Sequence, residues 1–430
     1  MKMLPAIRVC VLLLLIAGRA AAQPDSNEIK KILRSHINIL AAPNMHGRGY
    51  VNEGVELAAE YIEQQFRRYR LERISGMRSY RQSYHFSVNT FPGRADVALN
   101  GKKLVPGRDY LVDAGSPPFK CSKMRVAQKD ISTYATVEEW KKAAADLDKK
   151  TIYLLQNADS FCKVAGIRAS LLYTVLPQGC FIVPVKTKQS WTVAQDLADA
   201  TIIYVYDSVL PANVTTADMN IESKVVPKYE NFNIIGKVPG ELKDSIIVFS
   251  AHYDHLGRMG DAVFPGASDN ASGVAMLLYL AEYFAAHPQK FTMVFIAFSG
   301  EEAGLLGSAY FTEHPPFALR KIRMLLNVDI MGDATGGATV VNATVFPWQF
   351  SKLTAINEEH RYLPEIKTRG KAANSDHYHF SEKGVPAFFM YTIGGKGYYH
   401  DIYDRAEEIS LNNMAGVARL LTDFAIQLQQ

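Results

Sequence analysis

Cysteine and net charge are both scarce in this sequence. Its 430 residues include four cysteines, and 47 basic against 43 acidic side chains leave a formal net charge of +4. So small an excess of one sign indicates neither a nucleic acid nor an anionic membrane surface as a partner. The sequence also has no internal repeat and no low-complexity tract, so neither feature organises the chain.

Long apolar runs are missing at the amino terminus. The run at residues 9–16 is too short to span a bilayer as a stable anchor. A positively charged start precedes it and small residues up to Ala22 follow it, so residues 1–22 have the three parts of a secretory signal. We expect cleavage after Ala22 and therefore an exported protein, periplasmic or secreted. Removing the three basic residues of this segment would lower the formal charge from +4 to about +1.

The remaining cysteines are too few for a disulfide framework to be read from their spacing. Cys121, Cys162 and Cys180 lie beyond the first 22 residues. An oxidising compartment would permit one disulfide bond among them and leave one free thiol. The sequence does not decide which pair would form that bond.

What is present is a strand, helix, strand pattern in the second half of the chain. The apolar runs 246–251 and 291–298 are short, rich in β-branched and aromatic residues, and without alternation. Such runs are typical of strands buried on both faces. Residues 272–287 between them are apolar at helical spacing and end before Pro288. This pattern predicts a βαβ crossover and a parallel sheet.

Side chains of the types that bind metals stand where these strands end: His252, Asp254, Glu301 and Glu302. The carboxyl ends of the strands are where open α/β sheets bind their ligands. A third apolar run, residues 324–331, carries an acid near its end, and further candidates lie before the helix or downstream: Asp269, Asp329, His377, His379, His400 and Asp404. Mixed nitrogen and oxygen ligands suit zinc or a related divalent ion, and two ions can share a bridging carboxylate.

Each of these patterns also has a purely structural interpretation. A His-x-Asp at a strand end is, alone, more often a surface turn, and a Glu-Glu pair is favourable at the start of any helix. Asp269 has the position of an ordinary N-cap, and His377 and His379 fit the edge of a core as well as a site. Asp329 is harder to dismiss, because an unpaired carboxylate beside a buried strand is costly. We favour a metal site because the separate signals fall on one rim of one sheet.

The pattern changes between residues 87 and 228. Short strands there are separated by charged or amphipathic segments, without a cluster of metal-binding types: residues 97–99, 151–155, 180–185 and 201–206. The rest of the chain alternates strands and helices, with amphipathic helices expected at residues 26–41, 52–69 and 414–424, the last capped by Ser410. About 400 residues exceed the size of a single core. We predict an α/β domain, residues 23–86 and 229–430, interrupted by a smaller strand-rich domain, residues 87–228.

Six motifs resemble, in their order, the zinc aminopeptidases of metallopeptidase family 28. They are His252-x-Asp254, residues 266–273 around Asp269, residues 299–308 with Glu301-Glu302, Asn327-x-Asp329, Ser375-Asp-His377 and Tyr399-His400. This family also contains the glutamate carboxypeptidases and is related to the glutaminyl cyclases. The resemblance covers about residues 26–86 and 229–430, and residues 45–50 are similar to the family's N-terminal loop. Residues 87–228 lie where many members carry a protease-associated domain, and residues 148–155 are similar to one of its strands.

The resemblance implies a zinc exopeptidase fold, with a mostly parallel central sheet flanked by helices, and a set of five metal ligands. His252 and Asp329 would hold one zinc ion. Glu302 and His400 would hold a second, and Asp269 would bridge the two ions.

Other residues would then act beside the metals. Asp254 would orient the ring of His252. Glu301 would be the general base that takes a proton from the bridging water and returns it to the leaving amine. Tyr399 would donate a hydrogen bond to the developing oxyanion, although its neighbour Tyr398 is an alternative.

The function expected from this resemblance is that of an exported di-zinc aminopeptidase acting on peptides with a free N-terminus. There are three alternatives: a glutaminyl cyclase-like acyltransferase, a carboxypeptidase-type member of the family and a catalytically inactive receptor-like member. Retention of the full ligand set argues against the cyclase, which typically needs one zinc ion, and against the inactive member. The sequence leaves the preferred side chain and the oligomeric state open.

Overall fold

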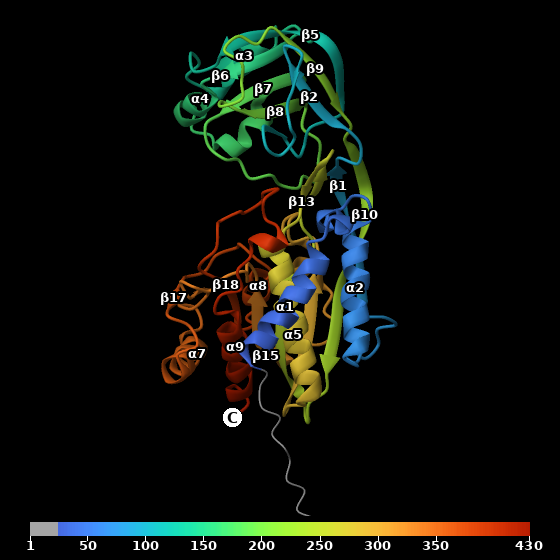
Figure 1. Ribbon diagram of the computed structural model, residues 1–430, viewed down its shortest axis with the longest axis vertical. Helices are drawn as coiled ribbons and strands as arrows, with labels where there is room; N and C mark the ends of the chain where they lie inside the picture. Colours follow the sequence, from blue (N-terminus) through green and yellow to red (C-terminus); the bar gives the residue numbers. More distant parts are fainter. Residues whose placement is uncertain (1–24) are drawn as a thin grey trace, which may run out of the picture.

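Two eight-stranded sheets dominate the architecture of this computed structural model, which describes residues 25–430. Figure 1 shows the first sheet with its helices in the lower part of the molecule and the second sheet above it, with β1 and β10 running between the two parts. The predicted secretory segment, residues 1–22, lies outside the described residues. Within residues 25–430, we find no helix with the length and apolar character needed to cross a membrane.

The first sheet has a parallel centre and mixed edges. Its strands, in spatial order, are β1 (Arg81–Thr90), β10 (Lys224–Val238), β14 (Phe291–Phe298), β11 (Leu242–His252), β15 (Ile322–Val328), β18 (Ala387–Thr392), β16 (Ala338–Val341) and β17 (Ile366–Thr368). The run β14, β11, β15, β18 is parallel throughout, whereas β1, β10 and β16 join antiparallel to their inner neighbours. The predicted α/β fold with a mostly parallel central sheet is therefore confirmed.

The centre of this sheet is buried on both faces, as its unbroken apolar runs predict. Ile247, Val248 and Phe249 of β11 are all 0% exposed. Phe249 stacks on Phe295 of β14 and on Phe284 of α5 (Ser272–Ala286), each with ring centroids 5.7 Å apart. Burying an aromatic side chain this completely stabilises a fold by about 1.5–3 kcal/mol.

The helices pack through apolar stripes at helical spacing. In α1 (Ser26–Leu40) the buried residues include Ile29, Leu33 and Ile37, which lie against α5 and α9 (Met414–Gln427). Asp25 caps α1, because its carboxylate accepts the main-chain N–H groups of the first turn. The remaining helices are α2 (Gly54–Arg68), α3 (Val137–Ala144), α4 (Ala158–Val164), α6 (Leu306–Glu313), α7 (Pro347–His360) and α8 (His377–Glu382).

The predicted cap of the terminal helix is wrong. The residue that precedes α9 is Asn413, which has φ 56° and makes no side-chain cap. Ser410 instead donates a hydrogen bond to the carboxylate of Asp333. The serine stands too far before the helix because a turn that includes Asn412 and Asn413 lies between them.

The second sheet lies within residues 95–221. Its strands, in spatial order, are β3 (Lys102–Lys103), β2 (Ala95–Leu99), β9 (Thr216–Ile221), β5 (Phe119–Asp130), β6 (Ile152–Gln156), β7 (Gly179–Val185), β8 (Ala200–Tyr206) and β4 (Tyr110–Val112). The run β5, β6, β7, β8 is parallel. Two buried clusters pack on it, separate from the core of the first sheet: one includes Trp140 and Phe181, and the other includes Trp191 and Ile203.

The two parts of the molecule meet along continuous strands. The predicted boundaries near residues 86 and 228 fall inside β1 and β10, which pair from Arg81 with Ile234 to Thr90 with Lys224. A hairpin of β12 (Gly257–Met259) and β13 (Ala262–Phe264) packs against the core of the second sheet. The division of the chain into domains stays a prediction.

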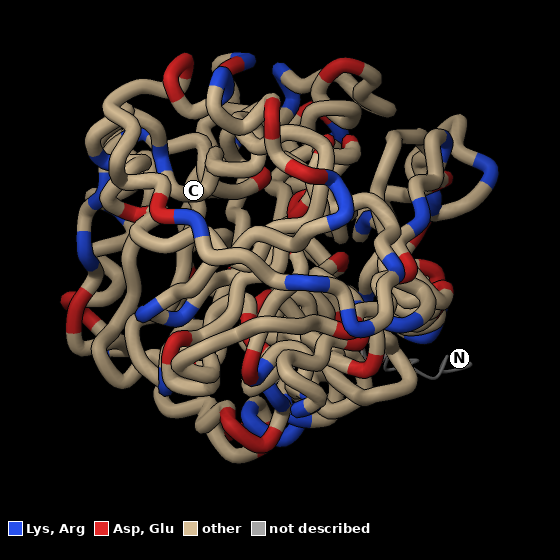
Figure 2. Tube along the Cα trace, turned by 90° about the horizontal axis from the view of Figure 1, so that it is seen from above, with Lys and Arg blue, Asp and Glu red and all other residues tan. Residues whose placement is uncertain are grey.

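Charged residues and cysteines are distributed as the composition suggests. Seen from above, lysines and arginines are interspersed with aspartates and glutamates along the chain (Figure 2).

Cys121, Cys162 and Cys180 are free thiols, and no disulfide joins any of the described residues. Burial raises the pKa of Cys162 and Cys121.

Candidate metal centre

The structure brings the five predicted ligands together at one edge of the first sheet. His252 ends β11 and Asp329 follows β15, while Glu302 lies in the turn after β14. Asp269 lies in the short turn η3 (Ala267–Ala271) that leads into α5, and His400 lies in the loop after β18. Because β11 is parallel to both β14 and β15, the three strand ends meet at the same edge. All five side chains are less than 10% exposed.

The two carboxylate oxygens of Asp269 face two different groups. His252 Nε2 lies 3.3 Å from Asp269 Oδ1 and 3.4 Å from Asp329 Oδ1. On the other side, His400 Nε2 lies 3.3 Å from Asp269 Oδ2 and 3.2 Å from Glu302 Oε2. Asp269 therefore stands between two imidazole and carboxylate pairs.

These spacings fit divalent cations. Nitrogen and oxygen ligands about 2.0–2.2 Å from a tetrahedral zinc ion are about 3.3–3.5 Å from each other. The oxygen Oδ1 of Asp329 is buried and accepts no hydrogen bond within residues 25–430, while its Oδ2 accepts one from the Ser375 hydroxyl at 3.3 Å. One oxygen of this buried carboxylate therefore lacks a protein donor. The ligand spacings fit a cation on each side of Asp269, and the unsatisfied oxygen of Asp329 adds support on the His252 side.

The electrostatics of the cluster favour added positive charge. Burial opposes a charge on His400, but the neighbouring Glu302 and Asp269 raise its pKa to about 11. Burial likewise opposes a charge on His252, while Asp329 and Glu301 raise its pKa well above the ordinary value. The negative charge of the carboxylates at this edge thus favours protonated imidazoles at His252 and His400 when no cation balances that charge.

Two buried charged side chains hold the turn that carries Asp269. Arg48 is 0% exposed and donates to the main-chain carbonyls of Gly266 at 2.7 Å and of Asp269 at 3.1 Å. Asp404 accepts the main-chain N–H of Asp269 at 3.0 Å. Gly266 has φ 58°, and a Cβ there would lie 2.1 Å from the carbonyl oxygen of Asp269, so only glycine fits.

Asp254 contacts His252 through its main chain rather than through its carboxylate. His252 Nδ1 lies 3.2 Å from the carbonyl oxygen of Asp254 and 3.8 Å from its Oδ1. The carboxylate instead accepts the main-chain N–H groups of Glu301 at 3.4 Å and Glu302 at 3.2 Å, and the hydroxyl of Tyr50. Asp254 therefore holds the turn that presents both glutamates, in addition to lying behind the His252 ring.

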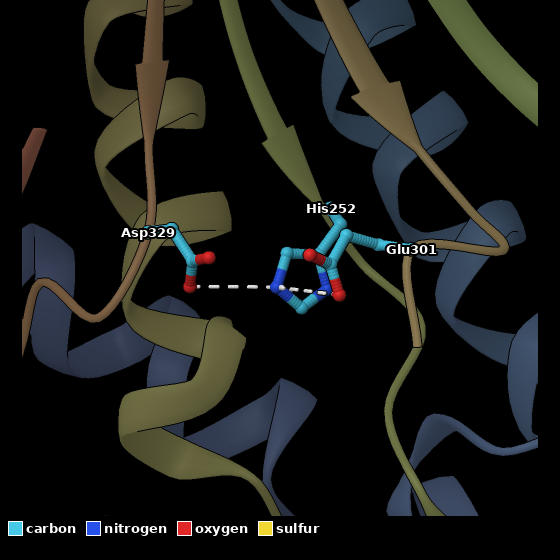
Figure 3. Close-up of side chains that lie close together, drawn as sticks. All are labelled: His252, Glu301 and Asp329. Atoms are coloured by element: carbon cyan, nitrogen blue, oxygen red, sulfur yellow. Dashed lines mark ion pairs between the residues drawn. The ribbon is translucent and has the colours of Figure 1, made fainter. Parts of the chain in front are cut away.

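Glu301 lies on the opposite side of His252 from Asp329, as Figure 3 shows. Its Oε2 is 4.0 Å from His252 Nε2, farther than the spacings between the ligand pairs. Burial raises the pKa of Glu301 well above its ordinary value, and Glu302 adds to the rise although His252 opposes it. Glu301 is thus a carboxylate that takes up a proton readily, and its oxygen also lies within 4.8 Å of ligand atoms of His252 and Asp329, so these three side chains could together hold an ion.

A cavity of about 340 Å³ opens beside the cluster. The side chains of Tyr399 and Glu301 line it together with residues from the strand β18 and the segment before α8: Arg369, Asn374, Phe389 and Tyr391. The ring of Tyr399 stacks on His400 with centroids 3.8 Å apart and is 49% exposed. Tyr398 is turned away toward Tyr403, with ring centroids 5.9 Å apart.

Not all candidates from the sequence join the cluster. His377 is buried against Phe389, and His379 lies in α8 at half-buried depth. Sequence reasoning gave no role to His255, although its Nδ1 lies 2.6 Å from Glu302 Oε1. The only signal for His255 was its place in the strand-end motif that also contains His252. Arg48 carried a weaker signal, its place in the loop at residues 45–50.

Comparison with known proteins identifies the family of this region. The model for Peptidase family M28 matches residues 233–425. This part of the chain belongs to peptidase family M28. The match includes every predicted ligand and the turn with Glu301.

The alignments with proteins of similar sequence cover only part of each of those proteins. Aminopeptidase YwaD of Bacillus subtilis is 30% identical over 219 residues, 48% of this chain and 46% of that protein. A probable zinc metalloprotease of Pyricularia oryzae is 39% identical over 110 residues, 24% of this chain and 22% of that protein. The chain therefore spans about half of the first relative and about a fifth of the second.

Solved structures share the fold over nearly the whole chain. The crystal structure of BSAP, a zinc aminopeptidase from Bacillus subtilis, matches with a TM-score of 0.67 at 19% identity and covers 92% of this chain and 94% of its own. An aminopeptidase from Aneurinibacillus sp. strain AM-1 matches with a TM-score of 0.62 at 19% identity, covering 93% and 94%. At this level of identity the likeness establishes the fold.

Proposed function

We propose that this protein is a di-zinc aminopeptidase. The observation that carries the proposal is the position of Asp269, whose two oxygens lie 3.3 Å from His252 Nε2 and 3.3 Å from His400 Nε2. A single carboxylate in this position would bridge two ions, with Asp329 completing one group and Glu302 the other. Zinc is supported by the mixed nitrogen and oxygen ligands and by the relatives that are named zinc aminopeptidase or zinc metalloprotease.

The residues around the cluster have the parts that peptide hydrolysis needs. Zinc ions held there would polarise the scissile carbonyl and lower the pKa of a water molecule. Glu301 accepts the proton of the attacking water and donates it to the leaving amine, for which its raised pKa is suited. Asp254 fixes the turn that aims Glu301. Tyr399 would donate a hydrogen bond to the oxygen on which negative charge develops, a role supported by its position in the lining of the cavity beside the cluster.

One observation favours a second candidate, a carboxypeptidase-type activity. Arg369 lines the cavity beside the cluster, and its guanidinium would suit the terminal carboxylate of a peptide. Peptides with free and acetylated N-termini separate the two activities. An aminopeptidase cleaves only the free peptide, whereas a carboxypeptidase cleaves both and loses activity when the C-terminus is amidated.

Export is a further part of the proposal and rests on residues 1–22. Mass spectrometry of the protein recovered from the producing cell is expected to give a mature N-terminus at Gln23. Recovery of the uncleaved chain would contradict it.

Metal binding tests the bridging role of Asp269. Asp269→Asn removes the shared charge and should lower the affinity for both ions, each by at least about 100-fold. Even residues that only hold a metal ligand in place contribute about 10–100-fold to metal affinity. Glu302→Gln should lower mainly the affinity for one ion. Zinc titration against a competing chelator measures both affinities. An Asp269→Asn protein that binds two zinc ions as tightly as the wild type would show the bridge to be wrong.

A further inference from the structure

The loop between β7 and β8, residues 186–199, extends from the second sheet to the candidate metal centre. In Figure 1 the red segment after β18, which carries His400, rises toward the second sheet. The contact between the two is a hydrogen bond from His400 Nδ1 to the main-chain carbonyl of Trp191, 2.7 Å long. A residue of the second-sheet region thus lies directly behind a predicted zinc ligand.

This hydrogen bond determines which ring nitrogen of His400 can serve a metal. With the proton on Nδ1 donated to the carbonyl, Nε2 keeps its lone pair, and Nε2 is the atom near Asp269 and Glu302. His400 belongs to an irregular loop, where φ is 51°, and no sheet hydrogen bonds fix its position. The acceptor behind the ring is therefore important for its orientation.

The carbonyl of Trp191 is itself anchored. The Trp191 side chain is 5% exposed, and its Nε1 donates to the carbonyl of Val112 at 2.8 Å. Its ring stacks on Phe264, with centroids 4.6 Å apart and an interplanar angle of 20°. Phe264 ends β13, from which the chain continues into the turn with Asp269. Trp191 therefore packs between the core of the second sheet and the approach to the bridging ligand.

Two further side chains of the same loop contact the loops that carry the ligands. Lys188 Nζ lies 2.6 Å from Asp401 Oδ2 and donates to the carbonyl of Tyr399 at 3.3 Å. Gln195 Nε2 donates to the carbonyl of Ala303 at 2.9 Å. The β7–β8 loop thus holds the chain on each side of His400 and beside Glu302.

We propose that Trp191 is a positioning residue for the zinc ion held by His400 and Glu302, with Lys188 supporting the same loop. The second-sheet region then supplies the acceptor that orients one ligand. This inference rests on the proposed di-zinc function. It predicts that changes in the β7–β8 loop affect one ion and spare the ion held by His252 and Asp329.

The sequence offers a matched control in Trp140. Both tryptophans are buried in the second-sheet region, and the Trp140 Nε1 also donates to a main-chain carbonyl, that of Val175 at 3.0 Å. Trp140 packs in the other core, with Phe161 and Tyr134. Trp191→Phe and Trp140→Phe therefore remove equivalent indole hydrogen bonds at different distances from the centre.

The test is zinc titration of the full chain against a competing chelator. Trp191→Phe should lower the affinity for one zinc ion by about 10–100-fold and leave the affinity for the other unchanged. Trp140→Phe should leave both affinities unchanged. Lys188→Ala, at a side chain 43% exposed, should fold normally and weaken the same ion by a smaller factor. In a Glu302→Gln background, Trp191→Phe should have no further effect on the remaining ion.

Cobalt(II) substitution gives an independent readout. The visible absorption spectrum of the cobalt protein should change in Trp191→Phe and not in Trp140→Phe, since only the former alters the ligand field. If the wild type binds two zinc ions and both Trp191→Phe and Lys188→Ala bind them as tightly, the positioning role is wrong and the proposed function stands. A wild type that binds no zinc would overturn the proposed function and this inference together.

Discussion

The two sheets each contain a run of four parallel strands, and the carboxyl ends of those strands differ completely. In the first sheet they present His252, Glu301 and Asp329, all largely buried. In the second sheet the corresponding edge presents Asp130 at the end of β5 and Gln156 at the end of β6. Asp130 is exposed and accepts hydrogen bonds from Ser132 and Asn157, which hold its pKa below the ordinary value.

The comparison shows that a parallel edge is not a site by itself. An exposed carboxylate satisfied by neighbouring hydroxyl and amide groups has nothing to gain from a cation. Several buried carboxylates facing one another are costly unless a positive charge joins them, so their presence indicates a function. Burial without enough protein donors, rather than topology, distinguishes the edge of the first sheet from that of the second.

The largest expected contrast is catalytic. Glu301→Gln should retain both zinc ions and lose about 10²–10⁴-fold in turnover, the usual contribution of a positioned general base. Asp130→Asn, at the equivalent edge of the second sheet, is the control and should leave turnover and zinc content unchanged. Steady-state kinetics and metal analysis on the same samples measure the two quantities. Zinc lost from Glu301→Gln and retained by an inactive Glu302→Gln would reverse the assigned roles.

A second contrast concerns the two cores. Phe249→Ala and Phe181→Ala each empty a buried site, at 0% and 1% exposure, and should each lower the free energy of unfolding by about 3–5 kcal/mol. If the sheets form separate domains, denaturant unfolding will show two transitions, and each substitution will move a different one. A single transition displaced equally by both would mean that the sheets unfold as one unit.

The smallest contrast is in pH dependence, because residues 87–228 contain no histidine. His36, in α1 of the first part, is buried, and burial together with Arg68 lowers its pKa from 6.5 to about 4. Between pH 6.5 and pH 4 the unfolded chain binds more protons at this histidine than the folded chain does. The free energy of unfolding therefore falls as the pH drops through this range. At about 1.4 kcal/mol per pKa unit, the loss is at most about 3.5 kcal/mol.

His36→Gln keeps a hydrogen-bonding group beside Tyr61 and removes the titration. Denaturant unfolding at pH 6.5 and at pH 4.5 should therefore show a smaller drop in this variant than in the wild type. The transition assigned to the second sheet should be the same in both proteins. An identical drop in the variant would remove His36 as the cause.

The sequence by itself determined the parts of the structure that depend on local patterns. Unbroken apolar runs predicted the buried strands β11 and β14, and helical spacing predicted α1 and α5 within one or two residues of their ends. The same patterns placed His252 and the Glu301-Glu302 pair at one edge of a parallel sheet. Such features are readable because strand and helix periodicity arise from neighbouring residues.

Only the tertiary structure decided how the parts of the site face one another. That each oxygen of Asp269 meets a different histidine depends on a turn held by Arg48 and Asp404, far away in the chain. The Asp254 carboxylate accepts from the main chain of Glu301 and Glu302, 47 and 48 positions away, and Trp191 accepts from His400 across 209 positions; both contacts depend on packing between separate segments. No local pattern encodes such contacts, because their distances are set by the folding of both sheets.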